Sequence, residues 1–139
     1  MCCKSWKCSI TLEITTSGAN VSLPESNRIR NSRVVGISMP RAAGATLYSP
    51  NNAVLAADAV VGSSYLNLVN ANGTKILADL PLNQIQRDYN APEPLHVNWS
   101  DIDPTQSNVQ INTSASGYNA AHAMIFIFWL DCDNCGVPE

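Results

Sequence analysis

Short segments in which apolar and polar residues alternate dominate the chain. The clearest is Ser9 to Thr16, where Ile10, Leu12 and Ile14 share one face and the residues between them are polar. A period of two, with many β-branched residues, is typical of β-strands. The same criteria predict further strands at 33–38, 44–48, 64–69, 74–80, 95–99, 108–112 and 121–130.

The link between two of these strands predicts a hairpin. Residues 70–73 read Asn-Ala-Asn-Gly, and glycine accepts the left-handed backbone conformation that a tight link requires. The remaining connections are rich in Asn, Ser, Pro and Gly, and the longest predicted loops are 17–32 and 100–107.

Helical patterns are scarce. Pro81 to Tyr89 predicts one short helix, with Leu82, Ile85 and Tyr89 on one face, and Ala53 to Val61 fits either a strand or a short helix. About eight short strands with at most one or two short helices indicate an all-β fold, an antiparallel sandwich or barrel. The lack of crossover helices argues against a parallel α/β sheet.

The last predicted strand, 121–130, is apolar on both faces. Met124, Phe126, Phe128 and Leu130 alternate with Ile125, Ile127 and Trp129. A strand of an antiparallel sandwich normally has one solvated face, so a second apolar face must be covered by the chain's own loops or by another subunit. We expect Ile125, Ile127 and Trp129 to form an interface in a homo-oligomer.

The length and composition indicate a single domain, 1–139. Its terminal segments, 1–8 and 131–139, contain the cysteines. Charged residues are only 14% of the chain, against roughly 25% in typical soluble domains. The net charge of −3 and the absence of a basic run argue against contact with nucleic acid. The longest apolar run, 120–130, is too short for a membrane helix.

The five cysteines lie only at the two ends of the sequence. Cys132 and Cys135 have the CxxC spacing that can present two thiolates to one zinc ion, and Cys2, Cys3 and Cys8 can supply the remaining ligands if the ends meet. A disulfide between the ends and free thiols are the alternatives, and free thiols are the expectation. No cofactor is expected, and zinc is retained as a candidate at these five residues.

Candidate catalytic residues are isolated. His96 and His122 are the only histidines, and no nucleophile or ligand set is tied to them by spacing. Asp101 and Asp103 can hold a cation, but they lack the glycine and distal glutamate of a calcium loop, so a role in loop structure is favoured. No catalytic residue is assigned, and we do not expect an enzyme.

The order of these elements resembles a known family. The hairpin 64–80 running into 81–89, the Asn/Ser/Pro loops and the closing aromatic strand 125–130 resemble small single jelly-roll virion proteins, such as the penton and related capsid proteins of tailless bacteriophages. The resemblance is architectural and covers most of the chain. It implies an eight-stranded jelly roll that acts as a structural subunit in a ring or lattice.

We therefore expect a virion protein (capsid, penton or capsid-associated) that self-associates through β-sheet surfaces and contacts other virion proteins. It would be soluble in the cytoplasm before assembly. One alternative is a carbohydrate-binding or adhesion module with Trp99, Tyr89 or Tyr118 as stacking platforms. Another, a cupin-like enzyme, requires more histidine ligands than the chain has.

Overall fold

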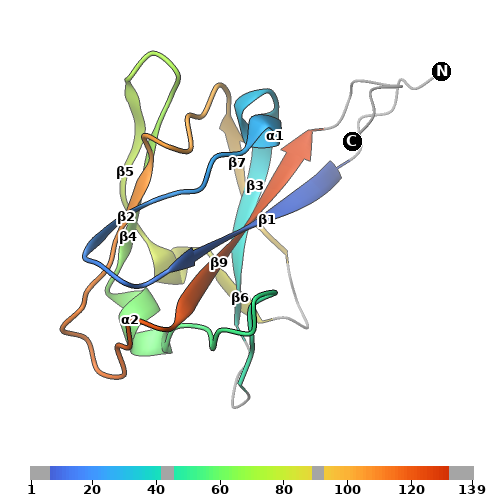
Figure 1. The fold of residues 1–139 in the computed structure, drawn as a ribbon. Helices are drawn as coiled ribbons and strands as arrows, with labels where there is room; N and C mark the ends of the chain where they lie inside the picture. Colours follow the sequence, from blue (N-terminus) through green and yellow to red (C-terminus); the bar gives the residue numbers. More distant parts are fainter. Residues whose placement is uncertain (1–6, 42–45, 89–92, 132–139) are drawn as a thin grey trace.

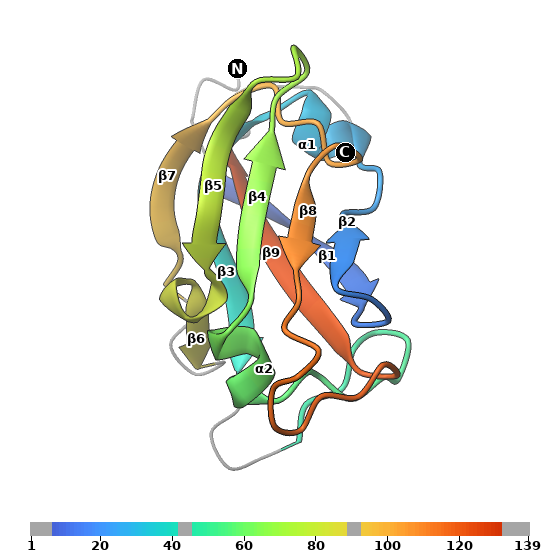
Figure 2. The same cartoon turned by 90° about the vertical axis from the view of Figure 1, so that its left-hand side faces the viewer.

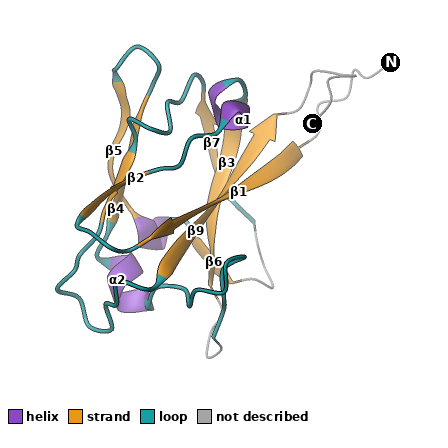
Figure 3. Cartoon of the chain, in the orientation of Figure 1, coloured by secondary structure: helices purple, strands orange, loops and turns teal. Residues whose placement is uncertain are grey.

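A computed structural model describes residues 7–41, 46–88 and 93–131. They form strands joined by loops and a few short helices (Figures 1 and 3). In chain order the elements are β1 (Lys7–Thr15), β2 (Asn20–Ser22), α1 (Asn27–Arg30), β3 (Arg33–Arg41), α2 (Asp58–Gly62), β4 (Tyr65–Val69), β5 (Lys75–Pro81), the 3-10 helix η1 (Leu82–Gln84), β6 (Gln86–Asp88), β7 (Leu95–Trp99), β8 (Asn108–Gln110) and β9 (Ala123–Asp131).

The strands form two sheets that pack face to face (Figures 1 and 2). One sheet has the order β1-β9-β3, with β7 and β6 both pairing with β3, and the other has the order β2-β8-β4-β5. Four antiparallel pairs are nested within one another: β1 with β9, β2 with β8, β3 with β7, and β4 with β5. This nesting, divided between two sheets, is the topology of a double-sheet jelly roll. The predicted all-β sandwich is confirmed.

The core lies between the sheets and follows the alternation of β9. Phe126, Phe128 and Leu130 are fully buried, and Met124 is 1% exposed. Across the sheet, Phe128 is in register with Ile10 of β1 and with a β3 residue, Ile37, that is also fully buried. Their large apolar side chains supply the main driving force for folding.

The predicted hairpin is confirmed. Its link is closed by the Asn70 side chain, whose Oδ1 accepts hydrogen bonds from the backbone N–H groups of Asn72 (3.0 Å) and Thr74 (2.9 Å). Gly73 has φ +81°, the left-handed conformation for which the glycine was expected. Asn and Gly therefore make separate contributions to the same turn.

The predicted helix at 81–89 is wrong. Only Leu82–Gln84 is helical, as a single 3-10 turn, and Gln86–Asp88 forms β6, which pairs in parallel with the end of β3. Leu82 and Ile85 are both fully buried, and a spacing of three residues fits one 3-10 turn as well as a helix. Ile85 O accepts a 2.8 Å hydrogen bond from Met39 N, which joins this segment to β3. Tyr89 lies outside the described residues.

Three other segments differ from the prediction. Residues 17–32, expected to be a loop, contain β2 and α1. The expected strand at 44–48 is reduced, within the described residues 46–48, to a single bridge between Tyr48 and Val54. The ambiguous stretch 53–61 enters as extended chain and becomes helical at α2. In the part of the chain that the structure describes, no helix is long and apolar enough to cross a membrane.

Candidate functional site

The outer face of the β1-β9-β3 sheet carries the residues that the sequence marks as an interface. Ile125, Ile127 and Trp129 all point away from the core, because the residues between them are buried inside it. Ile125 is nevertheless only 8% exposed, whereas Ile127 and Trp129 are partly exposed. The three residues therefore differ in their surroundings.

The chain's own connection between β3 and β4 covers Ile125. Ala123 N donates to Val54 O, and Ala56 N donates to Ala123 O, both at 2.9 Å, so this segment runs against the start of β9. A void of about 20 Å³ lies beneath it, lined by Leu55 and Ile125 among others. At this end of the strand the chain's own loop covers the outer apolar face.

Trp129 is held against β3. Its indole Nε1–H donates to Ser38 Oγ at 3.2 Å, and Ser38 is 2% exposed. A Cβ atom on the neighbouring Gly36 would lie 2.9 Å from Pro94 Cγ and 3.3 Å from Trp129 Cβ, so glycine is what allows these two side chains to approach β3. Ile127 and Trp129 thus form a small, partly exposed apolar patch on this face of the sheet.

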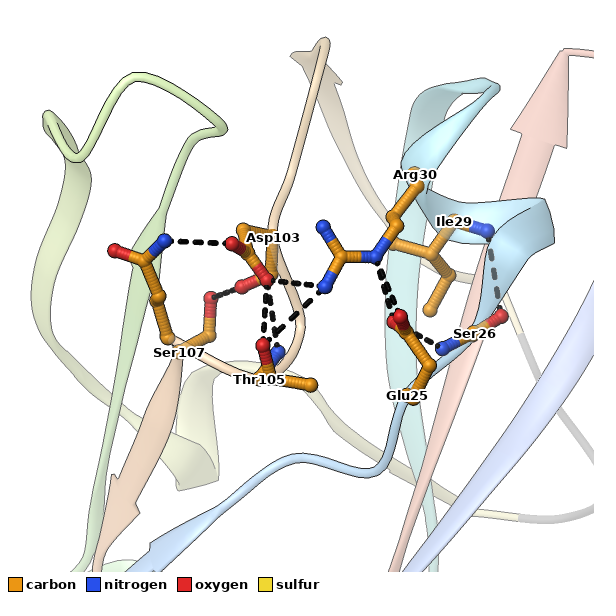
Figure 4. A network of polar contacts seen from close by, with 8 residues as sticks. Glu25, Ser26, Ile29, Arg30, Asp103, Thr105 and Ser107 are labelled. Atoms are coloured by element: carbon orange, nitrogen blue, oxygen red, sulfur yellow. Dashed lines mark hydrogen bonds and ion pairs between the residues drawn. The ribbon is translucent and has the colours of Figure 1, made fainter.

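A polar network joins α1 to the loop between β7 and β8 (Figure 4). Arg30 Nη2 donates to Asp103 Oδ1 at 2.7 Å, and its Nε donates to both carboxylate oxygens of Glu25 at 2.6 and 2.8 Å. Asp103 also accepts from the backbone N–H and hydroxyl of Thr105 and from the side-chain amide of Gln106. Asp103 is therefore used within the loop, as the sequence favoured, and Asp101 adopts a left-handed backbone conformation with φ +58°.

The protonation of this pair follows from its contacts. Burial alone would raise the pKa of Asp103, but hydrogen bonds from Thr105, Gln106 and Arg30 outweigh it and hold that pKa below its ordinary value. The pKa of Arg30 is raised, mainly by its hydrogen bond to Glu25. Both groups are charged at neutral pH, and their ion pair links α1 to the loop between β7 and β8.

A pocket that the sequence did not indicate lies between the end of β3 and the β3–β4 connection. Its volume is about 360 Å³, and its polar lining includes Arg41, Asp58 and Gln86. Gln86 Nε2 donates to Asp58 Oδ1 at 3.0 Å, and Arg41 Nε lies 3.4 Å from Asp58 Oδ2. These polar groups partner one another, so nothing in the lining selects a ligand. The residues that meet here come from distant segments, which no local pattern could bring together.

The other candidate residues are dispersed. Trp99 and Tyr118 pack against the core, and the Tyr118 hydroxyl donates to Thr16 O at 2.5 Å. His96 is exposed, with Nε2 3.6 Å from Glu93 Oε1, and His122 has a buried Nδ1 without a hydrogen-bond partner. Among residues 7–41, 46–88 and 93–131, no three His, Cys, Asp or Glu side chains are grouped as metal ligands.

The candidate zinc ligands fall almost entirely outside this range. Cys2, Cys3, Cys132 and Cys135 lie outside the described residues, and Cys8 belongs to β1, in register with Leu130. No protein family, curated protein sequence or solved structure matches the chain.

Proposed function

We propose that this protein is a structural subunit of a virus or phage particle that self-associates through its β-sheet surfaces. The observation that carries the proposal is the strand order of the two sheets, β1-β9-β3-β7 and β2-β8-β4-β5. Viral capsid proteins, lectins and cupins use this jelly-roll architecture, and the surface of the sheets distinguishes among these functions.

The surface favours assembly over sugar binding. Two of the three aromatic residues suited to stacking on a sugar, Trp99 and Tyr118, are packed against the core. Ile127 and Trp129, by contrast, form a partly exposed apolar patch on the outer face of a sheet, and the chain as a whole has few charges to repel a neighbour. In this proposal the patch contacts another copy or another virion protein, and Ile125 supports it from beneath the loop.

Substitution of the patch tests the proposal. The full chain, purified under reducing conditions, is expected to form oligomers by light scattering, and Ile127→Asp is expected to lower the mass of these oligomers. Asn98→Asp adds the same charge to an exposed position on β7 of the same sheet and should leave the mass unchanged.

Circular dichroism separates loss of assembly from loss of folding. If Ile127→Asp is unfolded, the milder Ile127→Thr, which keeps a β-branched side chain, replaces it. A folded Ile127 variant with the wild-type mass would overturn the assignment of this patch.

A further inference from the structure

Strand β1 forms one edge of its sheet, and its outer side is unpaired within the described residues. It pairs with β9 alone, over all nine residues, in a register without shifts from Lys7 opposite Asp131 to Thr15 opposite Ala123. Unpaired edges of this kind are templates for pairing with another strand.

The backbone groups on that edge can be identified from the ladder. In an antiparallel pair, opposed residues alternate between those that exchange hydrogen bonds and those that exchange none. Thr16 N donates to His122 O at 3.0 Å, and this pair continues the β1–β9 register. Even-numbered residues of β1 therefore bond to β9. The N–H and C=O groups of the odd-numbered Ser9, Thr11 and Glu13 point to the free side.

The other three edges are short or irregular, whereas β1 is long and has a regular register. β2 has only three residues. β5 has an irregular register with β4 and, at Asp79, a left-handed residue with φ +56°. The edge opposite β1 is divided between the short strands β6 and β7, and β3 is irregular beside β7. Short strands, irregular registers and prolines hinder pairing at a sheet edge. β1 is nine residues long, has a regular register and contains no proline.

We propose that β1 pairs with β1 of a second copy of this chain, antiparallel about a two-fold axis, with Ile10 opposite Ile10. Symmetry requires each residue to oppose one of the same parity, so the free odd-numbered groups meet one another. This symmetric register places Ile10, which is only partly buried, at the two-fold axis.

Side-chain burial agrees with this register. Ile10 packs against the core but remains partly exposed, unlike Leu12 and Ile14 on the same face of β1. At the two-fold axis each Ile10 would cover the other. The exposed Ser9 would oppose Thr11, which adds a polar cross-strand pair on the outer face.

The pairing would join two five-stranded sheets into one continuous sheet. The apolar patches of Ile127 and Trp129 from both copies would then lie on the same surface. The inference deepens the proposed function by naming the surface where self-association begins, and it rests on that proposal only for its biological role.

The test removes one backbone donor from the edge. In Thr11→Pro the lost N–H takes no part in the β1–β9 ladder, so the fold should persist, whereas pairing across the edge should be lost. Thr11→Val keeps both the N–H and the β-branched shape and is the matched control. With a reductant present to prevent disulfide links, native mass spectrometry should show a dimer of 15.0 kDa chains for the wild type and Thr11→Val, and a monomer for Thr11→Pro.

A wild-type protein that is only monomeric, or a Thr11→Pro dimer, overturns the proposal. If Thr11→Pro is unfolded by circular dichroism, Thr11→Lys, which keeps the N–H and brings like charges together across the axis, takes its place and should also be monomeric.

Charged pairs at positions 9 and 11 test the register. The double variant Ser9→Glu with Thr11→Glu opposes two carboxylates and should weaken the dimer at least several-fold, whereas Ser9→Lys with Thr11→Glu opposes unlike charges and should retain it. An equal effect of the two double variants contradicts this register. Loss of assembly in Ile127→Asp but not in Thr11→Pro would remove the edge pairing and leave the proposed function standing.

Discussion

The alternation along β9 makes a quantitative prediction about the two faces of one strand. Phe128 is fully buried between Ile10 and Ile37, whereas the adjacent Ile127 lies on the opposite, partly exposed face. Truncation of a fully buried phenylalanine to alanine removes its transfer free energy and leaves a cavity. Phe128→Ala should therefore lower the free energy of unfolding by about 3–5 kcal/mol.

The matched variant at the next position should cost less. Ile127→Ala removes a smaller side chain that water already reaches in part, so we expect a loss of about 1–2 kcal/mol. A domain of this size is stable by roughly 5–15 kcal/mol, so both variants should fold. With a urea m-value of about 2 kcal/mol per molar, Phe128→Ala should lower the unfolding midpoint by about 2 M and Ile127→Ala by about 0.5–1 M.

Urea unfolding followed by circular dichroism, at a protein concentration where light scattering shows a monomer, gives both midpoints. A loss at Ile127 equal to or larger than that at Phe128, with unchanged m-values, would refute the assignment of the two faces. So would a Phe128→Ala loss below about 1 kcal/mol, since a fully buried aromatic side chain cannot be removed so cheaply.

Three further predictions concern single contacts. The pKa of Asp103 is lower in the folded state than in the unfolded state. The ionised carboxylate therefore stabilises the protein above the unfolded-state pKa, and this stabilisation is lost as the pH falls through the folded-state pKa. Below about pH 5, the urea midpoint should fall more steeply with decreasing pH for the wild type than for Asp103→Asn. Gly36→Ala places a methyl group 2.9 Å from Pro94 Cγ and should cost about 1–3 kcal/mol by thermal unfolding, while Gly62→Ala, with no atom within 4 Å, should be neutral or slightly stabilising. Asn70→Ala removes two acceptor contacts of the β4–β5 turn and should cost about 1 kcal/mol, and an unchanged melting temperature would show that the turn forms without them.

Local patterns predicted the elements whose structure depends on local chemistry. The inward and outward sets of β9 follow from its alternation, and the β4–β5 hairpin follows from its Asn and Gly. β7, predicted at 95–99, has those bounds in the structure. β2 was missed because three residues with one apolar side chain, Val21, give no detectable period.

Long-range contacts account for what the sequence could not supply. The loop over Ile125 is held by hydrogen bonds between Ala123 and the distant segment 54–56. The Arg30–Asp103 ion pair joins residues that are 73 positions apart in the sequence. The free edge of β1 is equally invisible in sequence, because alternation shows which face a residue occupies but not which side of the strand finds a partner.

The account's central claim is that this jelly roll builds a particle. The most direct measurement is immunogold electron microscopy of nuclease-resistant particles purified from the biological source of the chain, with antibodies raised against the full-length protein. The account predicts regular labelling of intact particles and a chain-to-particle ratio that is constant between preparations. Protein found only in the unassembled fraction, with unlabelled particles, would contradict it.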